Sequence, residues 1–246
     1  MIFDKLKCAI KTPEIEFFCE ERDFGIIPKP FSARKSLPEW YKELPQYVER
    51  ENNANDFSIL PTIKRCPPFL DAMVIGWIIP LAADVYFKSN QNGSYNQYKS
   101  EFYKPIIENH FEEQITSKKS PNPNLPKPPL KWMNYWQIKV PRGYSVLFIP
   151  PLNRPENRFT CLSGIVDCDE FEEYINFPFF WNVSNFNGII HAGTPLVQVI
   201  PIKRDNLIKK SVVRKSNKKE IIESSKFRRR YSVSSSIYRN FIWKRK

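Results

Sequence analysis

The chain has few of the residues that build metal centres and disulfide frameworks. Its 246 residues include two histidines and five cysteines, and no two cysteines form a C-x-x-C pair. Structural zinc needs four closely arranged ligands, so we expect no metal site. No cofactor is expected either. Widely spaced cysteines in odd number are typical of buried, reduced thiols.

Long apolar runs are also absent. The longest, residues 74–87, contains Pro80 and Asp84 and is too short to cross a bilayer. Lys5, Lys7 and Lys11 interrupt any apolar segment near the start, so no secretory signal is expected. These features predict a cytoplasmic protein without a membrane span, located in the host cell cytoplasm or the virion if the chain is viral.

Aromatic residues and proline, by contrast, are abundant. The chain has 19 Phe, 11 Tyr, 6 Trp and 22 Pro. Aromatic side chains fit a pleated, half-buried surface, whereas many prolines favour turns and sheet edges over long helices. The composition therefore predicts a mainly β protein.

The order of patterns along the chain predicts three parts. Residues 1–35 have no clear period and are expected to be an irregular N-terminal segment, 36–205 a single β-rich domain, and 206–246 a basic tail. Ser36 and Glu39 have the spacing of a capping box and predict a short helix. A second short helix is expected to begin at Cys66-Pro67-Pro68 and to end near Gly76.

Short apolar segments bounded by Pro, Gly and Asp predict the strands. Residues 77–87 resemble one buried strand, with Pro80 at a bulge or an edge. The other predicted strands cover residues 133–139, 144–150, 159–166, 172–181 and 195–202. The aromatic run 177–181 is expected to lie partly in a subunit interface or in the inner core.

The positive charge is concentrated at the end of the chain. From Lys203 onward there are 16 Lys and Arg but three acidic residues, a balance of +13 in a protein whose net charge is +12. Clustered cations attract polyphosphates, and interleaved aromatic residues can stack on bases. The tail is therefore predicted to contact nucleic acid or another polyanion, with a solubilising or partner-docking tail as the alternative. The candidate polyanion-binding residues are Arg228, Arg229, Arg230, Lys244, Arg245 and Lys246.

Three blocks within residues 140–203 resemble the core of the dUTPase and dCTP deaminase superfamily. They are Pro141-Arg142-Gly143-Tyr144, then Gly164-Ile165-Val166-Asp167-Cys168-Asp169, and then Gly193-Thr194-Pro195-Leu196-Val197-Gln198. The resemblance implies a dUTPase-like β-barrel of the β-clip type around residues 132–203. It also implies a homo-oligomer, with a trimer suspected, and it assigns Asp167 the role of binding the sugar and orienting the attacking water.

The chain departs from that family where phosphate would be bound. The family's P-R-S-G turn aligns with Pro150, Pro151, Leu152 and Asn153, and no glycine follows Gly193 to form a glycine-rich arm. Arg154 could partly replace the missing arginine. The candidate nucleotide-binding residues are therefore Asp167, Asp169, Arg154 and Gln198, and Asp167 is the catalytic candidate if the protein is an enzyme. The alternative is structural: two aspartates that cap a tight turn and a buried glutamine.

A second resemblance covers residues from about 38 to 205. The segments 38–42, 63–72 and 77–81 look like an uncharacterised family found in marine phages and some bacteria. Together, these features favour a phage-type accessory or structural protein over an enzyme, one that self-associates and docks through its basic tail. One alternative is a nucleotide-binding or nucleotide-hydrolysing dUTPase relative that uses Asp167. Another is a virion component whose tail contacts packaged nucleic acid.

Overall fold

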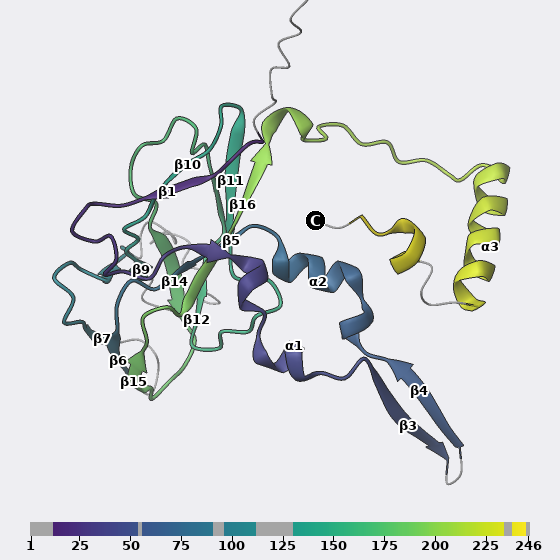
Figure 1. Ribbon diagram of the computed structural model, residues 1–246, viewed down its shortest axis with the longest axis horizontal. Helices are drawn as coiled ribbons and strands as arrows, with labels where there is room; N and C mark the ends of the chain where they lie inside the picture. Colours follow the sequence, from purple (N-terminus) through teal and green to yellow (C-terminus); the bar gives the residue numbers. More distant parts are fainter. Residues whose placement is uncertain (1–11, 54–55, 91–95, 112–129, 234–237, 245–246) are drawn as a thin grey trace, which may run out of the picture.

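The computed structural model describes residues 12–53, 56–90, 96–111, 130–233 and 238–244. Strands dominate these residues and form five sheets, accompanied by a few short helices and one longer helix near the C-terminus (Figure 1). The predicted mainly β class is confirmed.

A five-stranded antiparallel sheet forms the centre of the body. Its order is β13 (Gly164–Val166), β11 (Tyr144–Ile149), β16 (Pro195–Lys203), β5 (Trp77–Pro80) and β2 (Phe31–Ser32). The longest of these strands, β16, lies between β11 and β5 and has four consecutive buried residues, 196–199. A strand covered on both faces reads as a continuous apolar run rather than as an alternation, which explains the sequence of this segment.

Two further sheets complete the core. One has the order β12 (Phe159–Cys161), β14 (Phe177–Trp181), β9 (Leu130–Trp132) and β8 (Ile107–Asn109). The other has the order β15 (Asn187–Ile190), β6 (Val85–Ser89) and β7 (Asn96–Lys99). A small pair joins β1 (Glu16–Phe18) to β10 (Gln137–Lys139).

Stacked aromatic rings join these sheets. The ring centroids of Trp132 and Phe179 are 4.4 Å apart, and those of Phe87 and Trp181 are 3.8 Å apart. Phe177, Phe179 and Trp181 are all buried within their own chain. The aromatic run 177–181 thus belongs to the inner core, the second of the two places expected for it.

The expected β-barrel is not closed: the described strands form separate open sheets. Several predicted strands are in fact corners where the chain passes from one sheet to another. Residues 159–166 divide into β12 and β13, and residues 77–87 divide into β5 and β6. Residues 133–136 and 172–176 form no strand. Because these segments change partners within a few residues, consecutive stretches of the chain belong to different sheets.

The helices near the start of the chain partly match the prediction. Helix α2 (Pro67–Val74) begins at Pro67 as expected, because proline presets the backbone of a first helical residue. The predicted capping box is wrong: α1 (Glu39–Glu43) is preceded by Pro38 without a side-chain cap. Ser36 instead belongs to the short 3-10 helix η1 (Ala33–Ser36), and its hydroxyl accepts a hydrogen bond from Arg154.

A hairpin that the sequence did not predict projects from the helices. Strands β3 (Tyr47–Asn53) and β4 (Asp56–Pro61) pair with each other alone among the described strands. Figure 1 shows the hairpin extending away from the body, beyond α1. The 3-10 helix η2 (Ile63–Arg65) leads from it into α2.

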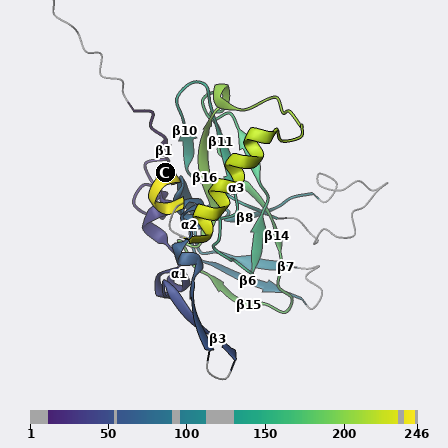
Figure 2. The ribbon, with the colours of Figure 1, turned by 90° about the vertical axis from the view of Figure 1, so that its right-hand side faces the viewer.

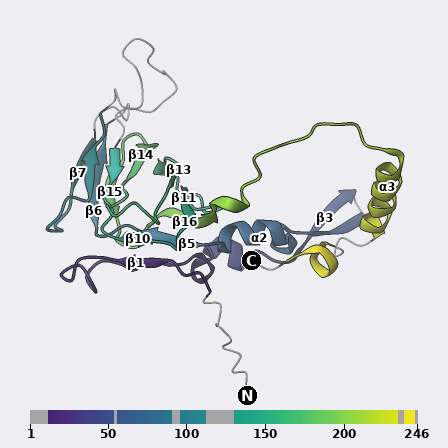
Figure 3. The ribbon, with the colours of Figure 1, turned by 90° about the horizontal axis from the view of Figure 1, so that it is seen from above.

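The C-terminal part contains defined helices and returns to the body. After the 3-10 helix η4 (Arg204–Asn206), an extended segment leads to α3 (Lys218–Val233) and then to one π-helical turn, η5 (Tyr238–Ile242). Seen from above in Figure 3, this segment arches away from the sheets, and Figure 2 looks onto the outer side of α3. The Trp243 indole N–H donates to Asp71 Oδ2 of α2 at 2.8 Å.

Gly76 permits the close approach of α2 to the central sheet. Its φ is +74°, and a Cβ built there would lie 2.0 Å from the carbonyl oxygen of Val199 on β16. Only glycine tolerates both the left-handed backbone and this contact.

We therefore expect Gly76→Ala to lower the free energy of unfolding by roughly 3 kcal/mol or more, since backbone strain and overpacking add. Gly25 is the matched control, because its φ is +90° but no atom lies within 4 Å of a Cβ. Gly25→Ala should cost about 1 kcal/mol. Urea denaturation measures both values, and equal losses would contradict the packing argument.

Candidate functional site

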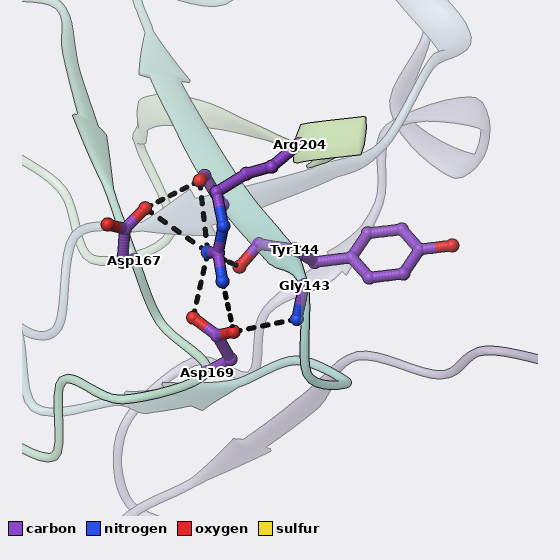
Figure 4. Close-up of polar contacts among 6 residues, drawn as sticks. Gly143, Tyr144, Asp167, Asp169 and Arg204 are labelled. Atoms are coloured by element: carbon purple, nitrogen blue, oxygen red, sulfur yellow. Dashed lines mark hydrogen bonds and ion pairs between the residues drawn. The ribbon is translucent and has the colours of Figure 1, made fainter. Parts of the chain in front are cut away.

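The two aspartates of the dUTPase-like block meet an arginine at one end of the central sheet (Figure 4). Asp167 and Asp169 lie on the turn that follows β13, and Arg204 directly follows β16. Because β11 lies between β13 and β16, the start of β11 completes this group through residues 143–145. We call these six residues the Arg204 cluster.

Asp169 is the buried member of the cluster. Its side chain is 1% exposed and takes two hydrogen bonds from the Arg204 guanidinium, at 2.9 and 2.5 Å. The Gly143 amide donates to the same carboxylate at 2.8 Å. The hydrogen bonds from Arg204, assisted by that amide, lower the pKa of Asp169 to about 2. The same pairing raises the pKa of Arg204, so the pair remains charged.

Asp167, the catalytic candidate, is exposed. Its side chain is 64% exposed, and Oδ1 accepts a hydrogen bond from the Ser145 hydroxyl at 2.5 Å and lies 3.3 Å from Arg204 Nη1. Its backbone carbonyl accepts from the amides of Glu170 and Phe171, which closes the turn. A general base that abstracts a proton from water works best when it is partly desolvated. The structural interpretation fits Asp169, whose carboxylate accepts the Gly143 amide of a neighbouring turn, whereas the Asp167 side chain binds the Ser145 hydroxyl and Arg204.

Arg154 faces a different part of the molecule. Its guanidinium donates to the Ala33 carbonyl at 2.6 Å, to the Met73 carbonyl at 2.9 Å, and to both the hydroxyl and the carbonyl of Ser36. Burial lowers the pKa of Arg154. The side chain thereby places a cation at the C-terminal end of α2, where the helix dipole favours positive charge.

Gln198 is fully buried and binds the same helix end. Its Nε2 donates to the carbonyls of Ala72 and Ile75 at 3.0 and 2.6 Å, and its Oε1 accepts from the Leu152 amide at 2.9 Å. The last carbonyls of a helix have no partner within the helix. Gln198 and Arg154 supply those partners, and we call this arrangement the α2 joint. The expectation of a buried, hydrogen-bonded glutamine is confirmed, although its partners are a helix end and a loop.

The four candidate nucleotide residues therefore do not converge. Gln198 lies six residues before Arg204 along β16, a separation of roughly 20 Å in an extended strand. Arg158, four residues after Arg154, is another arginine of this loop, and its Nε and Nη2 atoms pair with Glu156 at 2.8 and 2.7 Å. Arg204, which holds the cluster together, was missed, because a single arginine after a strand carries no recognisable sequence signal.

The pocket beside Asp169 has the wrong charge for a triphosphate. It has a volume of about 250 Å³ and is lined by Asp169, Glu170 and Glu172 but by only one cation, Lys139. Phosphate sites gather cations and backbone amides. A nucleotide placed there would meet net negative charge.

The cations of the tail, by contrast, are exposed on α3. The helix begins with a reciprocal cap, in which Asn217 Oδ1 accepts from the Glu220 amide at 2.9 Å and Glu220 Oε2 accepts from the Asn217 amide at 2.8 Å. Arg214 pairs with the same carboxylate and, with the Asn217 amide, lowers the pKa of Glu220 to about 2. The exposed cations of the helix are Lys218, Lys219, Lys226, Arg228, Arg229 and Arg230.

The spacing of these cations places several of them on one side of the helix. Lys219, Lys226 and Arg230 are separated by seven and four residues, so they lie one above another on the helix surface. Lys244, beyond η5, is also exposed. Arg245 and Lys246, the last two polyanion-binding candidates, lie outside the described residues.

Among the described residues, no group of three His, Cys, Asp or Glu side chains could hold a metal ion. In the same part of the chain, no helix is long and apolar enough to cross a membrane. Cys161 and Cys168 are buried, as expected for structural thiols, whereas Cys19 is half-buried and Cys66 is exposed. Cys8 lies outside the described residues.

The buried pair predicts a specific dependence on pH. The pKa of Asp169 is about 2 in the folded protein, against about 3.9 for an unperturbed aspartate. Its carboxylate therefore stabilises the fold above about pH 4, and this contribution is lost as the pH falls toward 2. Asp169→Asn should unfold more easily than the wild type at pH 7 and should lose less stability between pH 4 and 2.

Asp167→Asn is the matched control, because it changes an exposed carboxylate in the same cluster. Urea denaturation at several pH values separates the two variants. A loss of stability in Asp167→Asn as large as that in Asp169→Asn would contradict the assignment of the buried carboxylate as the structural one.

The comparisons with known proteins add no assignment to this geometry. No family model matches the chain, and no curated protein is significantly similar to it. The function must therefore be argued from the arrangement of charge, exposure and hydrogen bonds described above.

Proposed function

We propose that the protein is a non-catalytic, phage-type accessory or structural protein that self-associates and binds nucleic acid through its basic C-terminal part. The observation that carries this proposal is a contrast in the surroundings of the polar and charged residues. Asp169, Arg154 and Gln198 are occupied by internal hydrogen bonds, whereas the cations of α3 are exposed to solvent.

The chemistry of α3 suits a nucleic-acid backbone. Lysine and arginine side chains neutralise phosphates and release condensed counterions, which favours binding at low salt. Phe227 lies among these cations and is 45% exposed, so it could stack on an unpaired base. The nucleic-acid backbone would meet Lys219, Lys226 and Arg230 on one side of α3.

The features of the body favour a scaffold role over catalysis. The alternative, a nucleotide-binding or nucleotide-hydrolysing protein, depends on Asp167, whose carboxylate is accessible but lacks the partial burial that suits a general base. The acidic lining of the nearby pocket opposes it. The virion alternative uses the same helix, with packaged nucleic acid as the ligand. The resemblance of residues 38–205 to phage proteins supports a place in the virion or the infected cell.

A salt titration tests the proposal. We expect full-length protein to bind a single-stranded oligonucleotide with an affinity that falls steeply as salt rises, and truncation after Asp205 to abolish binding while the body stays folded. Replacing Arg228, Arg229 and Arg230 with glutamine should reduce the slope of log K against log salt by about two.

The control replaces three exposed cations of the body, Lys88, Lys139 and Arg142, with glutamine. This variant has the same net charge as the α3 variant but should keep nearly the wild-type slope. If both variants lose binding equally, total charge rather than α3 determines the affinity. If the truncated protein binds as tightly as the full chain, the tail is not the binding element.

A further inference from the structure

Two exposed segments have the sequence character of β-strands but join no larger sheet among the described residues. The first is the β3–β4 hairpin, a two-stranded sheet whose outer edges have no strand partner among the described residues. An isolated hairpin is marginally stable in water, and three strands or a packed face are usually needed. Exposed edges also invite pairing with another chain.

The surface of the hairpin combines apolar and acidic residues. Tyr47, Val48 and Ile59 are exposed, Ile59 by 68%. Glu49 and Glu51 lie on the same face as Tyr47, because side chains alternate along a strand, and Ile59, the cross-strand partner of Glu49, lies on that face too. Residues 47–61 contain three acidic residues and one arginine, so the hairpin has a net negative charge.

The second segment is the extended stretch 207–213, between η4 and α3. Ile208, Val212 and Val213 are 94%, 84% and 98% exposed. No backbone hydrogen bond joins residues 208–216 to another segment of the chain that the structure describes. The sequence Leu-Ile-Lys-Lys-Ser-Val-Val is rich in β-branched residues, which favour strands. The segment has the length and composition of a strand, but it belongs to none of the described sheets.

The two segments complement each other. Residues 207–215 contain four cations and no acidic residue, opposite in sign to the hairpin. Both have exposed apolar side chains and unpaired backbone groups. Residues 207–213 match the seven residues of β3 in length. Within one chain the segments lie apart in both views that show them (Figures 1 and 3).

We propose that residues 207–213 of one copy add as a third strand to the β3 edge of the hairpin in a second copy. Backbone hydrogen bonds would provide the pairing, as in other cases of strand addition. Because side chains alternate along a strand, one of Lys209 and Lys210 would lie on the face of Glu49 and Glu51 and the other on the opposite face, so the net charges of the two segments provide the attraction. Reciprocal exchange closes a dimer, and head-to-tail exchange closes a ring such as the suspected trimer.

This inference rests on the self-association in the proposed function and specifies its interface. It is independent of nucleic-acid binding, because the association is measured with nuclease-treated protein and without oligonucleotide. A protein that binds nucleic acid but stays monomeric would overturn the inference and leave the other part of the proposal intact.

The experiment is sedimentation velocity on two charge-reversed variants of the full chain. Glu49→Lys with Glu51→Lys, and separately Lys209→Glu with Lys210→Glu, should each weaken association by roughly a hundredfold, since like charges then face each other. Mixing the two variants should restore a complex, because the reversed hairpin and the reversed segment are again complementary. Glu14→Lys with Glu173→Lys, on exposed residues of the body, is the matched control and should associate like the wild type.

A second variant tests strand pairing itself. Ser211→Pro with Val212→Pro removes two consecutive amide donors from a segment that is already extended. Because N–H groups alternate along a strand, one of the two would point toward β3, so this variant should block association without disturbing the fold. A monomeric wild-type protein at micromolar concentration would overturn the proposal. Normal association of the reversed variants or of the double proline variant would also overturn it, as would a failure of the mixed variants to form a complex.

Discussion

The hydrogen bonds that tie the C-terminal end of α2 to the central sheet are the interaction on which the other parts depend. Gln198 reaches from the middle of β16 and Arg154 from the loop after β11, and together they satisfy the carbonyls of Ala72, Met73 and Ile75. A buried carbonyl without a partner costs about 1 to 3 kcal/mol, so both side chains are required where they are. Gly76 allows the helix end to approach the strand closely enough for these contacts.

Through α2 this joint positions both appendages of the body. The hairpin leads directly through η2 into α2, and Asp71 of the same helix holds the indole of Trp243. Just after the end of β16, Asp169 fixes Arg204 at the point where the C-terminal part leaves the sheet. The chain between Arg204 and Trp243 is therefore held at both ends. This arrangement presents α3 and the extended segment before it on one side of the molecule instead of leaving them as a free tail.

The sequence predicted best where the local pattern and the tertiary structure agree. Residues 144–150 and 195–202 are bounded by turn residues and buried in the central sheet, and both form strands almost as predicted. Segments that change sheets, such as 159–166, look continuous in sequence because an apolar pattern does not record which strand pairs with which. The hairpin was missed because its polar residues lack the apolar alternation of a half-buried strand. The Ser36 cap failed because its hydroxyl binds Arg154, 118 residues away.

The structural interpretation of residues 164–169 predicted a tight, aspartate-rich turn, which the structure has, but the sequence could not reveal which aspartate is buried. That depends on Arg204, whose position follows from the register of β16 against β11. The central proposal is that Asp169, Arg154 and Gln198 serve the fold through the hydrogen bonds described above and are not ligands of a nucleotide. Thermal unfolding with and without dUTP tests it most directly, because any ligand that binds only the native state raises Tm. The account predicts an unchanged Tm at millimolar dUTP with magnesium. A rise in Tm that Asp167→Asn abolishes would contradict it.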